Sequence, residues 1–308
     1  MKRVLTAAVL IPVVLLIVFK APLWLFALVV AAIIVLALHE YLSIVEAAGI
    51  KPFRRQTYAI ALVPIFVSLF VYYRDGIDSP PRSYWIYPPG VLLLQDLWVF
   101  VALAPLLFGV LLVFRKELRS GLESVAASAF GMLYVGIPLS LLIAFRADPL
   151  QCILIVYVLF SVWGGDIAAY YVGRSLGRHK LAPIVSPNKS WEGAIASVVA
   201  SVVVSVLVFD LHTYIDPLFV PQPNSDLGFG QSAVSHFHAA VLGVLTNVAA
   251  QFGDLFESAL KRGAGVKDSG TLLPGHGGML DRIDALLFAV PVVWYYANLT
   301  KFLIKPIL

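Results

Sequence analysis

The residues best suited to chemistry in this sequence lie between Ser258 and Asp284. This stretch holds six glycines and lies between two apolar segments that are each long enough to cross a membrane. Charged groups near lipid are costly, so their presence there usually indicates a function. The charged residues of the stretch are Lys261, Arg262, Lys267, Asp268, Asp281, Arg282 and Asp284. Carboxylates combined with cations predict a site for a metal and a polyphosphate.

Helical spacing extends this cluster backward to Asp254. Asp254, Ser258 and Lys261 stand at i, i+4 and i+7, which places a carboxylate, a hydroxyl and an ammonium on one helix face. Asp281 and Asp284, at i and i+3, share a face at the start of the next apolar segment. We therefore expect two helix ends that each present a carboxylate and a cation to one shared loop.

Oxygen ligands and phosphate chemistry favour Mg²⁺ at this position. Mg²⁺ usually takes one or two protein carboxylates and its other ligands from phosphate and water, so the carboxylates of these helix ends are suited to hold it. Gly277 and Gly278 would let backbone N–H groups approach a ligand, and His276 would hydrogen-bond a phosphate or a base. The phosphates would be neutralised by four cations, Lys261, Arg262, Lys267 and Arg282. A salt-bridged cytoplasmic loop is the alternative, although such a loop does not need six glycines.

Two further polar clusters precede this stretch. Asp166 closes an apolar run, with Tyr170 one helical turn later; it either pairs with or binds a cation, or extends to water. Lys189 precedes Ser190, which can cap a helix that begins at Trp191. A helix N-terminus beside a lysine predicts an anion site, and an ordinary capped helix is the alternative. His39 and Glu40 are interpreted together as a helix-end pair.

The elements that position these residues are predicted to be membrane helices. The chain has 308 residues, is 60% hydrophobic and only 13% charged, and has a mean hydropathy of +0.89. Soluble domains are about 25% charged, so the sequence predicts an all-α polytopic integral membrane protein. Nine charge-free runs are long enough to span: Val4–Phe19, Ala21–Leu38, Gln56–Tyr73, Leu97–Phe114, Ser124–Phe145, Leu150–Gly165, Gly193–Phe209, Phe237–Gly253 and Ala285–Thr300. The first resembles a signal peptide, but no clear cleavage pattern follows it before Lys20, so it is interpreted as a first transmembrane helix.

The distribution of cations predicts the orientation. Sixteen of the 22 Lys and Arg residues fall in one alternate set of loops, which places the N-terminus and residues 254–284 in the cytoplasm and the C-terminus outside. The same bias accounts for the net charge of +4 without a nucleic-acid partner. We expect an N-terminal scaffold of about five helices over residues 1–147 and a catalytic region of about four helices over residues 148–308.

The stretch from Ser258 to Asp284 resembles the signature of the phosphatidate cytidylyltransferases, also called CDP-diacylglycerol synthases. Residues 186–193, SPNKSWEG, are similar to a second segment of this family. One position departs from the pattern: family members often carry Thr or Ser where Ile167 stands, so no hydroxyl is available there. The matching signature residues are Ser258, Lys261, Arg262, Lys267, Asp268, Gly270, Pro274, His276, Gly277, Gly278, Asp281, Arg282 and Asp284.

This resemblance implies an inner-membrane enzyme of phospholipid biosynthesis. It would transfer CMP from CTP to phosphatidic acid, giving CDP-diacylglycerol and pyrophosphate, and would be a homodimer of nine-span subunits. The family's metal site implies Mg²⁺ on Asp254 and Asp281, with a potassium ion as a possible second cation.

Each candidate residue then has an expected role. Lys261, Arg262 and Arg282 would stabilise the transition state and the leaving pyrophosphate, and Ser258 would orient a phosphate or a water molecule. The nucleotide or the lipid headgroup would be bound by Asp166, Tyr170, Lys189, Ser190, Lys267, Asp268, His276, Gly277, Gly278 and Asp284.

Two other classes of function remain open. One is a different lipid enzyme that uses CTP, such as an archaeol cytidylyltransferase or a polyprenol kinase. The other is a transporter in which buried Asp and Lys form an ion relay. The clustering of polar residues on one side and the absence of recognisable repeat halves argue against a transporter.

Overall fold

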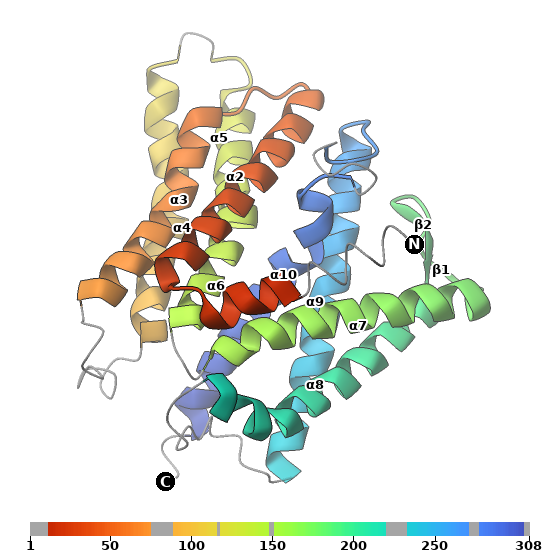
Figure 1. Cartoon of the computed structure of the whole chain (residues 1–308). Helices are drawn as coiled ribbons and strands as arrows, with labels where there is room; N and C mark the ends of the chain where they lie inside the picture. The colour runs from red at the N-terminus through yellow and green to blue at the C-terminus, as the bar shows by residue number, and fades with distance from the viewer. Residues whose placement is uncertain are drawn as a thin grey trace.

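The computed structural model describes residues 12–74, 89–115, 118–147, 151–219, 233–270 and 277–304. This part of the chain is almost entirely helical, as Figure 1 shows. Residues 12–20 are helical and precede the first helix with defined bounds. The elements that follow are α2 (Leu23–Ala47), α3 (Arg54–Arg74), α4 (Pro89–Val113), α5 (Gly121–Gly131), the π-helix η2 (Met132–Gly136), α6 (Ile137–Ala147), α7 (Cys152–Leu176), β1 (Lys180–Ala182), β2 (Ser186–Ser190), α8 (Trp191–Phe219), α9 (Ala233–Gly263) and α10 (Leu280–Ile304).

The helices confirm the all-α membrane class. Apart from end residues, every charge-free run after the first lies within one helix or within the continuous α5–η2–α6 segment. Within the described residues, five helical segments are long and apolar enough to cross a membrane: Leu23–Ala47, Gly121–Ala147, Cys152–Leu176, Trp191–Leu211 and His236–Gly263. The count of nine spans and the orientation stay predictions.

A short β-hairpin departs from the predicted all-helical chain. β1 and β2 pair antiparallel, with Lys180 opposite Ser190 and Ala182 opposite Ser186, and the hairpin projects beside the end of α7 (Figure 1). The sequence predicted the helix cap at Ser190 but not this pairing. Pro187 is tolerated in β2 because both strands of a two-stranded sheet are edges, where a residue without an N–H is acceptable.

One apolar core joins the two predicted regions. Ile34 of α2, Met132 of η2, Tyr157 of α7 and Val290 of α10 are all fully buried and belong to the same cluster. Helices from both sides of residue 147 therefore pack together. The division into a scaffold and a catalytic region stays a prediction.

Polar contacts join α7, α8 and α9, which carry most of the predicted site. Asn247 of α9 donates to Ser197 Oγ at 2.9 Å and to Ser201 Oγ at 2.7 Å, both on α8. Ser201 in turn donates to the carbonyl of Ser161 on α7 at 2.8 Å. Gly165 lies against the same group, and a Cβ there would lie 2.7 Å from Ser197 Oγ and 2.9 Å from Ser201 Oγ. Small residues and buried polar groups are the usual means of close helix packing in membranes, so this network fixes the relative position of the three helices.

Candidate active site

Lys261 joins the end of α9 to the start of α10. Its Nζ lies 2.5 Å from Asp281 Oδ1 and 2.6 Å from Glu257 Oε2. The side chain is buried between these two carboxylates. The structure thus brings the two predicted helix ends together through a direct ion pair.

Asp281 accepts hydrogen bonds from other groups besides Lys261. Its Oδ2 accepts the Gly278 N–H at 2.8 Å and the Ser269 N–H at 3.2 Å, and it lies 2.9 Å from Ser269 Oγ. The residue lies in the first turn of α10, before the apolar run that begins at Ala285. Partial burial alone would raise the pKa of Asp281, but the bonds from Lys261, Gly278 and Ser269 outweigh it and lower the pKa to about 2. The same bonds favour the ionised form of Asp281.

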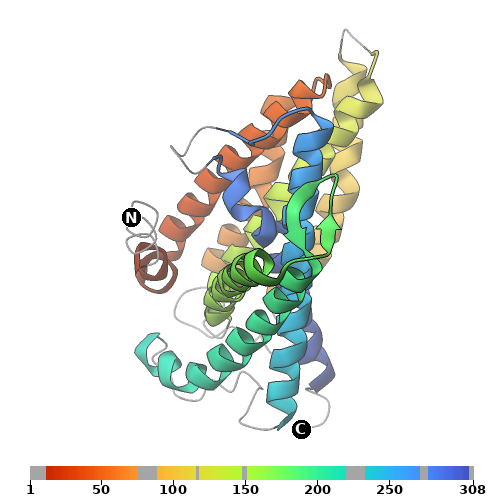
Figure 2. The same cartoon turned by 90° about the vertical axis from the view of Figure 1, so that its right-hand side faces the viewer.

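A second ion pair brings the hairpin to the same helix. Lys189 Nζ of β2 lies 2.6 Å from Asp254 Oδ2 of α9, and Figure 2 shows the hairpin beside α9. The next residue, Ser190, is buried and accepts the Gly193 N–H at 3.2 Å. This bond confirms the predicted cap of α8, which begins at Trp191.

Acidic residues outnumber the lysines around these two pairs. Asp284 of α10 lies within electrostatic range of Asp166, Asp254 and Glu257. Asp166 also interacts with Asp254 and Lys189, so all three polar clusters predicted from the sequence converge. The converging charged groups are the carboxylates Asp166, Asp254, Glu257, Asp281 and Asp284 and the ammonium groups Lys189 and Lys261. An excess of carboxylates of this size favours bound cations.

Sequence reasoning missed Glu257. It is buried, and only its Oε2 pairs with Lys261. Its Oε1 has no hydrogen-bond partner in the described part of the chain. The i, i+4 spacing of Glu257 and Lys261 is the local signal that would have found it.

The carboxylates of the site fit a Mg²⁺ ion that takes only one or two of its ligands from the protein. Among the described residues, no group of three or more His, Cys, Asp or Glu side chains is placed to hold a metal. Mg²⁺ commonly takes only one or two carboxylates and completes its shell with water and phosphate. Asp254 and Asp281 each engage a lysine, and they remain the predicted ligands.

Most of the other predicted residues in the described part of the chain are exposed. Ser258 is half-buried, whereas Arg262, Lys267, Asp268 and Arg282 are exposed. The Tyr170 hydroxyl accepts from Arg174 Nη1 at 3.0 Å. His276 lies outside the described residues.

The glycines of the signature pack tightly against carboxylates. Gly277 has a φ of +77°, a conformation that favours glycine. A Cβ on Gly278 would overlap Ser269 Oγ and Glu40 Oε2, and its N–H is already donated to Asp281. Close packing within the protein therefore accounts for Gly278, and a ligand-binding role for its N–H stays a prediction.

The interpretation of His39 and Glu40 as a helix-end pair is wrong. Helix α2 continues to Ala47, so both residues lie inside it. His39 Nδ1 lies 2.8 Å from Arg54 Nη2, whereas Glu40 is buried and bonds to residues of the signature loop and α10. Local spacing could not reveal a contact between residues so distant in sequence.

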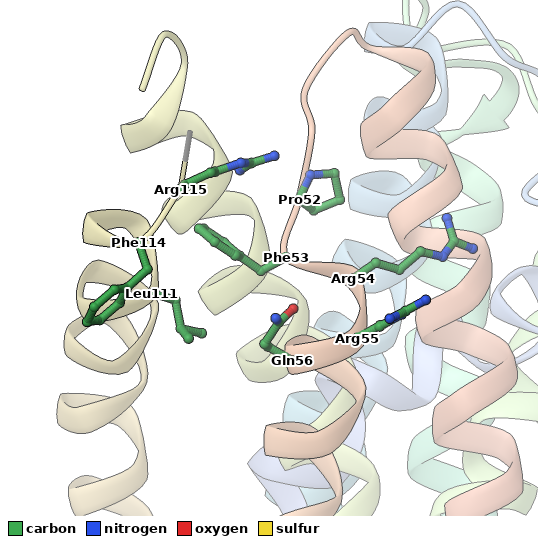
Figure 3. A pocket seen from close by; sticks show the side chains of 8 residues that line it. All are labelled: Pro52, Phe53, Arg54, Arg55, Gln56, Leu111, Phe114 and Arg115. Atoms are coloured by element: carbon green, nitrogen blue, oxygen red, sulfur yellow. The ribbon is translucent and has the colours of Figure 1, made fainter. Parts of the chain in front are cut away.

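A separate pocket lies where α3 begins and α4 ends (Figure 3), and none of the predicted site residues in the described part of the chain lines it. Its volume is about 410 Å³. Arg54 pairs with Glu46 at 2.7 Å, and the Arg115 guanidinium lies 4.8 Å from the centre of the Phe53 ring. Both guanidinium groups therefore already interact with other residues of the protein. The lining residues are Pro52, Phe53, Arg54, Arg55, Gln56, Leu111, Phe114 and Arg115.

The sequence of this chain is similar to those of known cytidylyltransferases. The profile of the cytidylyltransferase family matches residues 1–300, so this chain belongs to that family. The phosphatidate cytidylyltransferase of Haemophilus influenzae is 32% identical over 326 aligned positions, covering 96% of this chain and 97% of the relative. That of Brucella suis is 38% identical over 213 positions, covering 69% and 71%. That of Synechocystis is 30% identical over 282 positions, covering 90% and 89%.

Proposed function

We infer that this protein transfers CMP from CTP to phosphatidic acid, forming CDP-diacylglycerol and releasing pyrophosphate in phospholipid biosynthesis. The family match over residues 1–300, with relatives named phosphatidate cytidylyltransferase, supports this activity. The single structural observation that supports it is the ion pair of Lys261 and Asp281, which joins the two ends of the signature stretch.

The chemistry is mainly electrostatic. A phosphate oxygen of phosphatidic acid attacks the α-phosphorus of CTP, and the bond from that phosphorus to the bridging oxygen breaks, so that pyrophosphate leaves with the electron pair. The attacking phosphomonoester is already anionic, so no strong general base is required. The barrier comes from bringing two anions together, and positioned positive charge lowers it.

Lys261 is the cation best positioned for this task. Glu257 and Asp281 both contact its ammonium, so little reorganisation is needed when negative charge develops beside it. Arg262 and Arg282 are exposed and would reach the phosphates of CTP from the aqueous side.

Asp254 and Asp281 would hold Mg²⁺, and K⁺ would be a second cation. When bound, the cations neutralise charge on the phosphates. The excess of carboxylates over lysines supports this assignment. Both carboxylates would also orient the lysines that they contact.

The remaining residues would bind substrate. Lys189, placed against Asp254 at the capped start of α8, would contact a phosphate. Ser258 lies one helical turn from both Asp254 and Lys261 and would orient a phosphate or a water molecule. Nucleotide or headgroup contacts would also come from Asp166, Tyr170, Ser190, Lys267, Asp268, His276, Gly277, Gly278 and Asp284.

The site would lie at the cytoplasmic face of a nine-span inner-membrane protein. This arrangement lets the acyl chains of phosphatidic acid stay in the bilayer while CTP arrives from water. The bias of Lys and Arg toward one set of loops supports this orientation. A homodimer is proposed from the family resemblance.

Purified protein supplied with Mg²⁺, phosphatidic acid and CTP labelled at the α-phosphate tests the proposal. We expect label in the lipid product and one pyrophosphate released for each lipid labelled. Transfer of label from γ-labelled CTP would instead indicate a kinase. Turnover with an ether or polyprenol acceptor but not with phosphatidic acid would indicate another lipid enzyme, and the absence of any lipid product would contradict both.

A further inference from the structure

Glu40 of α2 connects the first half of the chain to the start of α10. Its side chain is buried, with 5% of the residue exposed. Its Oε1 accepts the Met279 N–H at 2.9 Å, and its Oε2 accepts the Leu280 N–H at 2.7 Å. These partners are 239 and 240 residues away in sequence. A single side chain thus bonds two consecutive backbone amides of a distant segment.

These amides are the ones that a helix leaves unsatisfied. α10 begins at Leu280, and the first N–H groups of a helix have no acceptor within it. A carboxylate at this end also interacts favourably with the helix dipole. Glu40, which belongs to α2, therefore caps the N-terminus of α10. Asp281 directly follows Leu280, whose N–H is one of the two capped groups.

Ser269 links Glu40 to Asp281 directly. Its Oγ lies 2.9 Å from Glu40 Oε2 and 2.9 Å from Asp281 Oδ2. The hydroxyl carries one proton, so it donates to one carboxylate at a time while remaining in contact with both. A Cβ on Gly270 would lie 2.6 Å from Glu40 Oε1, so the loop closes tightly around this carboxylate.

We propose that Glu40 is a positioning residue for CMP transfer, because its cap on α10 and its link through Ser269 set the place of Asp281 beside Lys261. This inference rests on the proposed function. Glu40 acts through Asp281 and not on the substrates. Groups that orient the residues of a site usually contribute on the order of 10- to 100-fold to activity or to metal affinity.

The variant Glu40→Gln tests this role, because it keeps the size of the side chain and replaces one acceptor oxygen by an NH₂ group. That group would face an amide N–H or the Ser269 hydroxyl. We expect kcat/KM for CTP to fall roughly 10- to 100-fold in protein that is folded at the assay temperature. Tyr41→Phe is the matched control, since Tyr41 is the next residue of α2, is equally buried and donates to the Ala127 carbonyl at 2.9 Å. It loses one interhelical bond whose acceptor is not a predicted site residue, and it should keep its kcat/KM.

Ser269→Ala provides a second, independent variant. It should also lower kcat/KM. In the double variant Glu40→Gln/Ser269→Ala, the fold-loss of kcat/KM should be smaller than the product of the two single fold-losses, because both substitutions interrupt one network. Independent losses that multiply in full would overturn the proposed link.

Amide hydrogen exchange gives a readout that does not require turnover. In Glu40→Gln the amides of residues 277–283 should exchange faster than in the wild type and in Tyr41→Phe. Unchanged exchange in this segment overturns the inference, as does wild-type kcat/KM in Glu40→Gln. If the wild-type protein makes no CDP-diacylglycerol, the proposed function fails, whereas exchange still decides whether Glu40 positions the start of α10.

Discussion

Lys261 Nζ lies 2.5 Å from Asp281 Oδ1, and this ion pair joins two helix ends separated by the whole signature loop. Glu257 Oε2 contacts the same ammonium at 2.6 Å. Lys261 therefore contacts two carboxylates at once and offsets part of their negative charge.

Replacing Lys261 by Met should abolish activity and destabilise the protein. The change leaves Glu257 and Asp281 without their shared cation, and loss of one partner from a buried ion pair costs about 3–5 kcal/mol. CDP-diacylglycerol synthesis and the thermal unfolding midpoint in detergent would show both effects. Lys180→Met, which removes an exposed ammonium from β1, is the control and should behave as wild type. A Lys261→Met protein with wild-type turnover would contradict the central role of this residue.

Asp281→Asn tests the metal assignment. The substitution keeps the shape of the side chain but removes its charge, and we expect kcat to fall by on the order of 10²- to 10³-fold. The Mg²⁺ concentration needed for half-maximal activity should rise if any activity remains. Removal of divalent cations by a chelator should also stop the wild-type reaction, and added Mg²⁺ should restore it. Near-normal turnover of Asp281→Asn at low Mg²⁺ would rule out Asp281 as a ligand.

Asn247→Ala should affect stability more than chemistry. The amide is buried with 2% of the residue exposed, and it donates to two serines of α8. Interhelical hydrogen bonds in membrane proteins are worth about 0.6 kcal/mol on average, up to about 1.7, so we expect a lower unfolding midpoint with KM for CTP unchanged. A shift in KM without a change in stability would mean that Asn247 acts at the site.

Local spacing predicted the parts of the site that lie on single helices. The i, i+4, i+7 pattern of Asp254, Ser258 and Lys261 anticipated one helix face, and α9 contains all three residues. Glu257, four residues before Lys261, follows the same helical spacing but was not among the predicted residues. Glu40 could not be found in this way, since its partners lie 239 and 240 residues away and no periodic pattern encodes a contact between distant helices.

The hairpin was missed for a different reason. β1 has three residues and β2 has five, and a polar segment this short has no clear alternation of apolar and polar positions. The capping serine was predicted because Ser190 obeys a local rule. What the sequence did not show is that pairing with β1 and the Lys189–Asp254 ion pair place this cap beside α9.

Lys189→Met should therefore weaken substrate binding more than it slows chemistry. Loss of a charged hydrogen bond to a phosphate is worth about 1.5–3 kcal/mol, so we expect KM for CTP or for phosphatidic acid to rise at least about tenfold with a smaller change in kcat. His179→Gln is the matched control, because His179 of the same hairpin region pairs with Glu192 at 2.7 Å but is exposed, and exposed pairs contribute little. Steady-state kinetics with each substrate varied in turn would separate the two constants. Equal effects of the two variants would mean that Lys189 only stabilises the hairpin, whereas a KM increase confined to Lys189→Met would assign it to the substrate phosphates.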